Sequence, residues 1–219
     1  MTICKIYYLL NQKEDYHIHC NYNDHSSIDL TIENILKRAN DLQLQKIAFT
    51  EHVRADSDWT EKYLEELKKY ENTTTIKILK GFEAKILSDG NVDCPLNYLN
   101  KDYFIIASFH TKYQDKEKWY NALIKTIRNE NVNVIGHLAP DPWISLEKKE
   151  INYLGEEIHS NNKIVEINAK YKRPPLEFIK IFKEQGVKFH LGSDAHSISE
   201  IANYKGIKNL INFIEHSEE

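Results

Sequence analysis

The sequence has 219 residues, of which 41% are hydrophobic and 28% are charged, and its formal net charge is −4. This length and composition predict one folded domain and exclude an intrinsically disordered chain. A pI near 6.2 excludes a global basic field that attracts long nucleic acid, and no apolar run reaches the length of a membrane span.

Apolar, β-branched runs alternate with longer amphipathic stretches along the chain, which predicts parallel strands joined by helical crossovers in one α/β domain over residues 15–219. Residues 1–14 precede the first run as an N-terminal extension with the pattern of an extra strand or hairpin. The predicted strands are 15–19, 46–50, 76–86, 103–110, 132–137, 163–168 and 187–192, and the predicted helices are 30–42, 61–71, 116–129, 145–160, 174–185 and 206–216.

Capping residues mark several of the predicted helix boundaries. Asp29 or Thr31 precedes the first helix, Thr60 the second and Ser145 the fourth, all of them residue types that accept hydrogen bonds from free N–H groups. Gly186 stands where the fifth helix should end, because glycine adopts the left-handed conformation of a helix C-terminus.

Histidines and carboxylates stand at or just after the C-terminal ends of these strands. Asp15, His17 and His19 alternate along the first strand and therefore share one face. The C-terminal ends of parallel strands gather at one rim of a sheet or barrel, so we expect the side chains at these ends to meet. The predicted metal ligands are His17, His19, His25, His52, Glu83, His110, His137, Asp194 and His196.

This ligand set is one of nitrogen and oxygen donors without a thiolate, which favours zinc, manganese or iron over calcium or magnesium. Nine ligands exceed the coordination of one ion, so we predict two or three divalent ions, with Glu83 as the natural bridge. Adjacent divalent ions polarise a phosphoryl group and lower the pKa of bound water. The predicted chemistry is therefore phosphoester hydrolysis.

Six motifs in this order resemble the polymerase and histidinol phosphatase (PHP) superfamily over residues 15 to about 205. They are Asp15–His19, Thr50–His52, Gly81–Glu83, Gly136–His137, Glu166–Asn168 and Gly192–His196.

The resemblance implies a distorted (β/α)7 TIM-like barrel with a trinuclear metal site. The first ion would be held by His17, His19, Asp194 and bridging Glu83, the second by Glu83, His110 and His137, and the third by His25, His52 and His196. Within the superfamily the chain looks most like stand-alone histidinol-phosphate phosphatases, although residues 138–143 depart from their pattern.

Further polar residues near the predicted rim are candidates for substrate binding and catalysis. Arg54, Arg173 and Lys170 could bind a phosphate, and bidentate arginine suits that role. Asp15 could orient a ligand histidine or assist proton transfer, and it joins Asp194 and His196 as the predicted catalytic group. His159, His190 and His216 are predicted to be structural or exposed to solvent.

We therefore expect a metal-dependent phosphomonoesterase in which a metal-bridging hydroxide attacks a small phosphorylated metabolite, histidinol phosphate or a related phosphomonoester. The alternatives are a phosphodiesterase or exonuclease on nucleotides or short nucleic-acid ends, and a metal-binding domain without catalysis. The three scattered cysteines read as reduced thiols, and the N-terminus lacks the pattern of a signal peptide, so we expect a cytoplasmic location. The sequence leaves the oligomeric state open.

Overall fold

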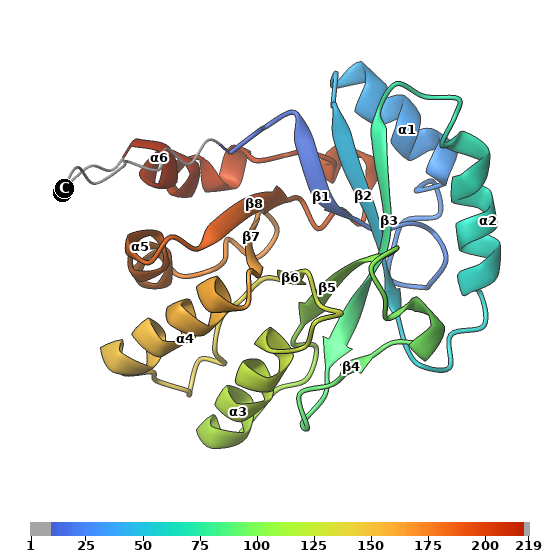
Figure 1. Cartoon of the computed structure of the whole chain (residues 1–219). Coiled ribbons are helices and arrows are strands. Elements are labelled where there is room, and N and C mark those ends of the chain that lie inside the picture. The colour runs from blue at the N-terminus through green and yellow to red at the C-terminus, as the bar shows by residue number, and fades with distance from the viewer. Residues whose placement is uncertain (1–9, 217–219) are drawn as a thin grey trace.

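The computed structural model describes residues 10–216, which form a ring of strands surrounded by helices (Figure 1). Seven strands run parallel in the order β1-β2-β3-β5-β6-β7-β8. Their bounds are β1 Glu14–Ile18, β2 Lys46–Val53, β3 Lys77–Ile86, β5 Phe104–Ser108, β6 Val134–Ile135, β7 Ile164–Asn168 and β8 Lys188–Gly192. Each predicted strand is present, and β6 is shorter than predicted.

The ring closes between β1 and the segment that follows β8. Ile18 forms a parallel bridge with Ala195, and the His19 N–H donates to the Ala195 carbonyl at 3.1 Å. The Asp194 N–H in turn donates to the His17 carbonyl at 2.8 Å. Closure is therefore made at the C-terminal rim, and the predicted distorted (β/α)7 barrel is confirmed.

One strand lies outside the parallel ring. The short strand β4 (Val92–Asp93) folds back on β3 as an antiparallel hairpin, and a single 3-10 turn, η1 (Leu96–Tyr98), follows it. This hairpin was not predicted, because a two-residue strand is too short to leave a periodic pattern in the sequence.

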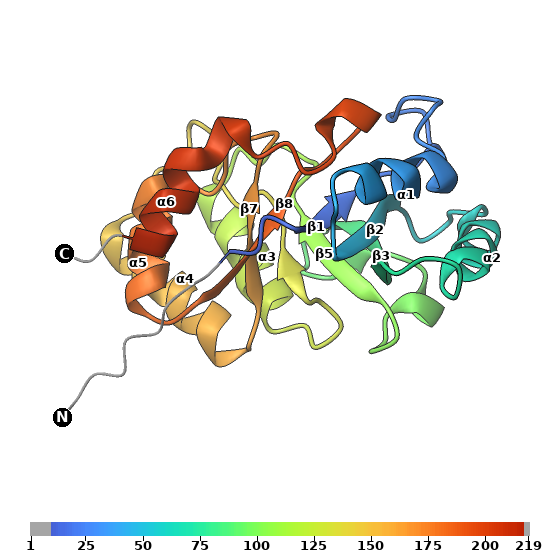
Figure 2. The ribbon, with the colours of Figure 1, turned by 90° about the horizontal axis from the view of Figure 1, so that it is seen from above.

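Six α-helices of the described chain lie outside the ring, α1 and α2 beside β1 to β3 and the others around β5 to β8 (Figures 1 and 2). Their buried residues recur at helical spacing, as in α1, where Ile32, Ile35 and Ala39 face the strands. The bounds are α1 Ile32–Asp41, α2 Thr60–Tyr70, α3 Lys116–Ile127, α4 Lys148–Ser160, α5 Leu176–Glu184 and α6 Lys208–His216.

The caps explain where the helix boundaries agree with the predictions and where they differ. Thr31 caps α1 by accepting the Asn34 N–H at 3.2 Å, as predicted. Thr60 is the first residue of α2 rather than its cap, and α4 begins three residues after Ser145, because Glu147 and Glu150 form a reciprocal capping box there. Gly186 follows α5 with φ of 78°, as predicted.

The extension predicted over residues 1–14 lies mostly outside the described residues. Residues 1–9 are not described, so the predicted extra strand or hairpin is not tested there, and residues 10–13 lead through a turn into β1. Within residues 10–216, no helix has both the length and the apolar character needed to cross a membrane.

Candidate metal centre

The predicted histidine pair on β1 lies at the C-terminal rim of the barrel. The side chains of His17 and His19 are fully buried, and their ring centroids are 4.9 Å apart. The register of β1 against β2 shifts between Asp15 and Ile18, so the strand bends where it carries His17. The bend and the closure with Ala195 place both rings inside the mouth of the barrel.

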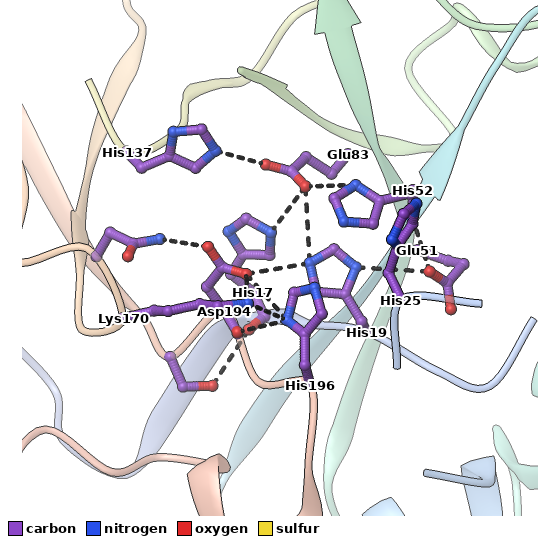
Figure 3. Close-up of polar contacts among 12 residues, drawn as sticks. His17, His19, His25, Glu51, His52, Glu83, His137, Lys170, Asp194 and His196 are labelled. Carbon is purple, nitrogen blue, oxygen red and sulfur yellow. Dashed lines mark hydrogen bonds and ion pairs between the residues drawn. The ribbon is translucent and has the colours of Figure 1, made fainter. Parts of the chain in front are cut away.

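Glu83 on β3 lies at the centre of the site (Figure 3). Its Oε1 is 3.3 Å from His110 Nε2 and 3.1 Å from His137 Nε2. Its Oε2 is 2.9 Å from His52 Nδ1, 3.5 Å from His17 Nε2 and 3.6 Å from His19 Nε2. The two oxygens of one carboxylate thus face two groups of imidazoles, as the predicted bridge requires.

Several buried nitrogen and oxygen atoms in this cluster have no hydrogen-bond partner. They are His17 Nε2, both ring nitrogens of His19, His52 Nδ1 and Glu83 Oε2. An unpaired buried polar atom is costly, and three of these nitrogens, on His17, His19 and His52, face the same oxygen of Glu83. Imidazole nitrogens and a carboxylate oxygen are ligands of zinc, manganese and iron, so the residues present fit a bound divalent cation.

Three overlapping triads bring their donor atoms within 4.8 Å of one another and could each hold an ion. They are His17, His19 and Glu83; His52, Glu83 and His110; and His19, His52 and His196. The grouping differs from the predicted one because His52 reaches Glu83. His25 is exposed at the rim, with its ring centroid 5.7 Å from that of His52, and it belongs to none of the triads.

Carboxylates dominate the electrostatics of the cluster. Burial lowers the pKa of His17, but Glu166, Glu83 and Asp194 outweigh it and hold this pKa well above the usual value. The pKa of His19 is raised in the same way to about 9, against burial, by Asp194 and Glu51. Burial opposes ionisation of Asp194, yet His17 and His19 lower its pKa. The site is therefore built to hold positive charge.

Two buried carboxylates that were not predicted as site residues support the histidines. Glu166 on β7 lies with its Oε1 2.6 Å from His17 Nδ1, and its Oε2 accepts the His137 N–H at 2.7 Å. Glu51 on β2 accepts the N–H groups of Cys20 and His52 and lies 3.5 Å from His19 Nδ1. The signal available in the sequence was an acidic residue inside an otherwise apolar strand.

The predicted catalytic residues lie at different depths. Asp194 and His196 line a pocket that lies over the cluster (the main pocket). His196 Nδ1 is 3.3 Å from Asp194 Oδ1. Asp15 does not reach the pocket. It is fully buried and accepts the backbone N–H groups of Ser193 at 2.9 Å and Ala202 at 2.8 Å, so it fastens β1 to the loop that carries Asp194 and His196. Burial raises the pKa of Asp15 to about 6.

The predicted substrate-binding residues also separate. Lys170 and Arg54 line the main pocket, and Lys170 Nζ lies 2.7 Å from His196 Nδ1. Arg54 donates to its neighbour's carbonyl, Val53 O, at 2.7 Å. Arg173 does not line the pocket, and its backbone pairs with Asn168 across a turn. Contact between Arg173 and a substrate stays a prediction.

The main pocket has a volume of about 450 Å³ and lies directly over the cluster. A second pocket of about 360 Å³ shares His110, His137 and Tyr171 with it. Two hydrogen bonds tie together the loops that flank this second pocket. Asp141 Oδ2 accepts the Tyr113 N–H at 2.7 Å, and Trp143 Nε1 donates to the Tyr113 carbonyl at 2.6 Å.

Comparison with known proteins agrees with this arrangement. The family model described as "PHP domain" matches residues 15–170. The chain belongs to the PHP domain family. The matched range begins at Asp15, where the first predicted motif starts, and it includes every predicted ligand except Asp194 and His196.

Curated relatives of the chain carry the name "probable phosphatase". One from Caldicellulosiruptor saccharolyticus is 32% identical over 66% of this chain and 63% of its own length, and one from Caldanaerobacter subterraneus is 31% identical over 66% and 60%. The chain thus spans about three fifths of the length of these relatives. A crystal structure of a candidate histidinol phosphatase from Listeria monocytogenes superposes with a TM-score of 0.64 at 16% identity, covering 87% of this chain and 97% of that one, and so shares the fold.

Proposed function

We propose that the chain is a metal-dependent phosphomonoesterase that hydrolyses a small phosphorylated metabolite, histidinol phosphate or a related phosphomonoester. The observation that carries this proposal is the set of three overlapping histidine and glutamate triads under a pocket of about 450 Å³. Membership of the PHP domain family and the name "probable phosphatase" given to relatives support it.

The ions belong in the three triads, with Asp194 close to the first of them, its Oδ1 3.3 Å from His19 Nε2. When bound, two or three divalent ions polarise phosphoryl oxygens and make a water molecule acidic enough to attack phosphorus at neutral pH. The reaction consumes one water molecule and yields an alcohol and inorganic phosphate. We assign Asp194 and His196 to holding ions, and Asp15 to positioning their loop.

Cationic side chains at the pocket supply the remaining recognition of a phosphate dianion. Lys170 and Arg54 are the described lysine and arginine that line the pocket over the cluster. Lys170 Nζ lies 3.6 Å from Asp194 Oδ1, so its positive charge lies directly beside a proposed metal ligand. We propose that Lys170 binds a phosphoryl oxygen and that Arg54 closes the other side.

The second pocket suits the organic part of the substrate. It adjoins the cluster through His137 and Tyr171, and its volume of about 360 Å³ limits the leaving group to a small molecule. The hydrogen bonds between Tyr113, Asp141 and Trp143 hold its wall in place without a ligand. The net charge of −4 disfavours a long polynucleotide as the substrate, because the chain has no overall positive charge to attract its phosphates.

The first experiment compares 4-nitrophenyl phosphate with bis(4-nitrophenyl) phosphate as substrates for protein loaded with zinc, manganese or iron. We expect turnover of the monoester to dominate, and a panel of histidinol phosphate, sugar phosphates and nucleotides then ranks the leaving groups. Preference for the diester would replace the proposal with a phosphodiesterase. Turnover of neither ester with any of the metals would contradict an esterase altogether.

Lys170 offers a sharper test with a neighbouring lysine as its control. Replacing Lys170 with Met removes the charge beside Asp194, and we expect KM for the monoester to rise about tenfold or more, as expected for a charge-assisted hydrogen bond of about 1.5–3 kcal/mol. Lys172→Met removes an exposed charge that does not line the pocket and should leave KM unchanged. Equal KM values in both variants would remove Lys170 from the binding set.

A further inference from the structure

Glu166 is a fully buried carboxylate behind the cluster, and both of its oxygens are used. Oε1 lies 2.6 Å from His17 Nδ1. Oε2 accepts the His137 N–H at 2.7 Å and the Asn168 Nδ2–H at 3.0 Å. Because an ionised carboxylate can only accept, His17 carries a proton on Nδ1, and Nε2, which faces Glu83 at 3.5 Å, is the nitrogen that can bind an ion.

The two residues that Glu166 holds stand on opposite sides of Glu83. His137 faces Glu83 Oε1, whereas His17 faces Glu83 Oε2 together with His19 and His52. Glu83 connects the two sides from the front and Glu166 connects them from behind. On the side of His17 the contacting oxygens are Glu83 Oε2 and Glu166 Oε1, and on the side of His137 they are Glu83 Oε1 and Glu166 Oε2.

The backbone around Glu166 is shaped to admit it. A side-chain carbon at Gly192 would overlap Glu166 Oε1, so only glycine leaves room for the bond to His17. His137 has φ of 26°, a value that non-glycine residues rarely adopt, and the bond from its N–H to Glu166 holds it there. Gly192 is the last residue of β8, and His137 follows β6. Residues at the ends of two strands therefore make room for, or bind, the side chain of Glu166.

We propose that Glu166 is a positioning residue that couples two ion positions. It fixes the ring of His17 in the triad of His17, His19 and Glu83, and it fixes the backbone of His137, whose Nε2 lies 3.1 Å from Glu83 Oε1 beside the triad of His52, Glu83 and His110. This inference rests on the metal cluster proposed above. It distinguishes Glu166 from Glu51, whose contacts are with Cys20, His52 and His19 instead. Loss of Glu166 therefore loosens His17 and His137, and loss of Glu51 leaves both of these residues held.

The test replaces Glu166 with Gln and measures ion content and Kd for zinc by competition with a chelator. A glutamine amide has one acceptor oxygen, so it can serve His17 or His137 but not both. Glutamine should therefore lower zinc affinity at one position, and Glu166→Ala, which removes both acceptors, should lower it about 10- to 100-fold at two positions, the range typical of outer partners of metal ligands. Glu51→Gln should lower zinc affinity through His19 and His52 and leave the signals of His17 and His137 unchanged.

A second readout follows the imidazole itself. In the wild-type protein the ¹⁵N spectrum of His17 should show a protonated Nδ1 and a zinc-bound Nε2, and E166Q should shift these signals, the backbone N–H signal of His137, or both. Gly192→Ala keeps the charge of Glu166 but places a side-chain carbon in overlap with its Oε1 and 2.8 Å from the Cβ of His17, so it should disturb the same signals. Lys163→Met, at the other end of β7 where Lys163 Nζ caps the carbonyls of Asn129 and Val132, should lower stability without changing zinc affinity.

Each outcome decides between separate statements. If the wild-type protein binds no zinc, the metal cluster itself is wrong and this inference falls with it. If the wild-type protein binds zinc and E166Q and G192A bind it with unchanged affinity and unchanged histidine signals, the coupling role of Glu166 is overturned while the cluster stands. Loss at a single position in Glu166→Ala would also overturn the coupling.

Discussion

Two buried histidines of the same barrel, His17 and His190, differ in almost every property that matters for chemistry. His190 lies on β8 two residues before Gly192, one layer below the cluster, and its ring stacks on Tyr16 at 4.7 Å. Burial lowers the pKa of His190 to about 4, whereas carboxylates hold that of His17 well above its usual value. Both rings have unpaired nitrogens, so a buried imidazole alone does not indicate a cation site. The carboxylates around His17 distinguish its layer, called the upper layer, from the lower layer of His190.

The largest effect is expected from removing the central carboxylate of the upper layer. Glu83→Gln keeps the volume of the side chain but removes the negative charge shared by two of the three triads. We expect ion affinity at those triads to fall more than about 100-fold, beyond the range for outer partners of metal ligands. Elemental analysis of purified protein should then find fewer ions per chain, no more than the remaining triad of His19, His52 and His196 can hold.

A matched control for this change is a carboxylate far from the rim. Glu150 on α4 accepts from Lys116 Nζ at 2.7 Å and caps its own helix. Glu150→Gln should leave ion content unchanged. Equal ion content in wild type, Glu83→Gln and Glu150→Gln would show that Glu83 is not a ligand.

The second effect is a pH dependence of ion binding that only the upper layer should show. In the ion-free protein the pKa of His19 is raised to about 9, so the ring carries an extra proton at neutral pH, and an ion must displace it. Apparent affinity should therefore rise with pH up to about 9, by about tenfold per unit for each proton displaced. Calorimetry in two buffers of different ionisation enthalpy counts the released protons, and zero release would contradict the assignment of His19.

The position of the metal cluster could largely be predicted from the sequence, because parallel topology brings the C-terminal ends of the strands together. This rule located His17, Glu83 and Asp194 at one rim. The same rule could not assign His52 to Glu83, since side-chain reach depends on the twist of β2 against β3. The Oε1 and Oε2 roles of Glu166 were likewise hidden, because they depend on contacts between β1, β6 and β7.

Asp15 shows another limit of the sequence pattern. Alternation predicts that Asp15 shares a face with His17, but the register of β1 shifts between Asp15 and Ile18, and the carboxylate of Asp15 accepts the N–H groups of Ser193 and Ala202 from the loop after β8. A loop conformation of this kind leaves no periodic signal. The predicted catalytic role of Asp15 is therefore replaced in our proposal by the positioning of that loop.

The smallest effect on ions is expected at His190, where the change should appear in stability alone. Because its pKa is lowered from 6.5 to about 4, the unfolded chain binds more protons than the folded one between these values, and stability is lost as pH falls through this window. His190→Leu removes this loss, so its stability relative to wild type should rise by about 2 kcal/mol between pH 7.5 and pH 5. Denaturant unfolding of both ion-free proteins measures this difference, in which the other histidines cancel. Identical pH slopes would show that folding does not lower the pKa of His190, and altered ion content would show that the two layers are not independent.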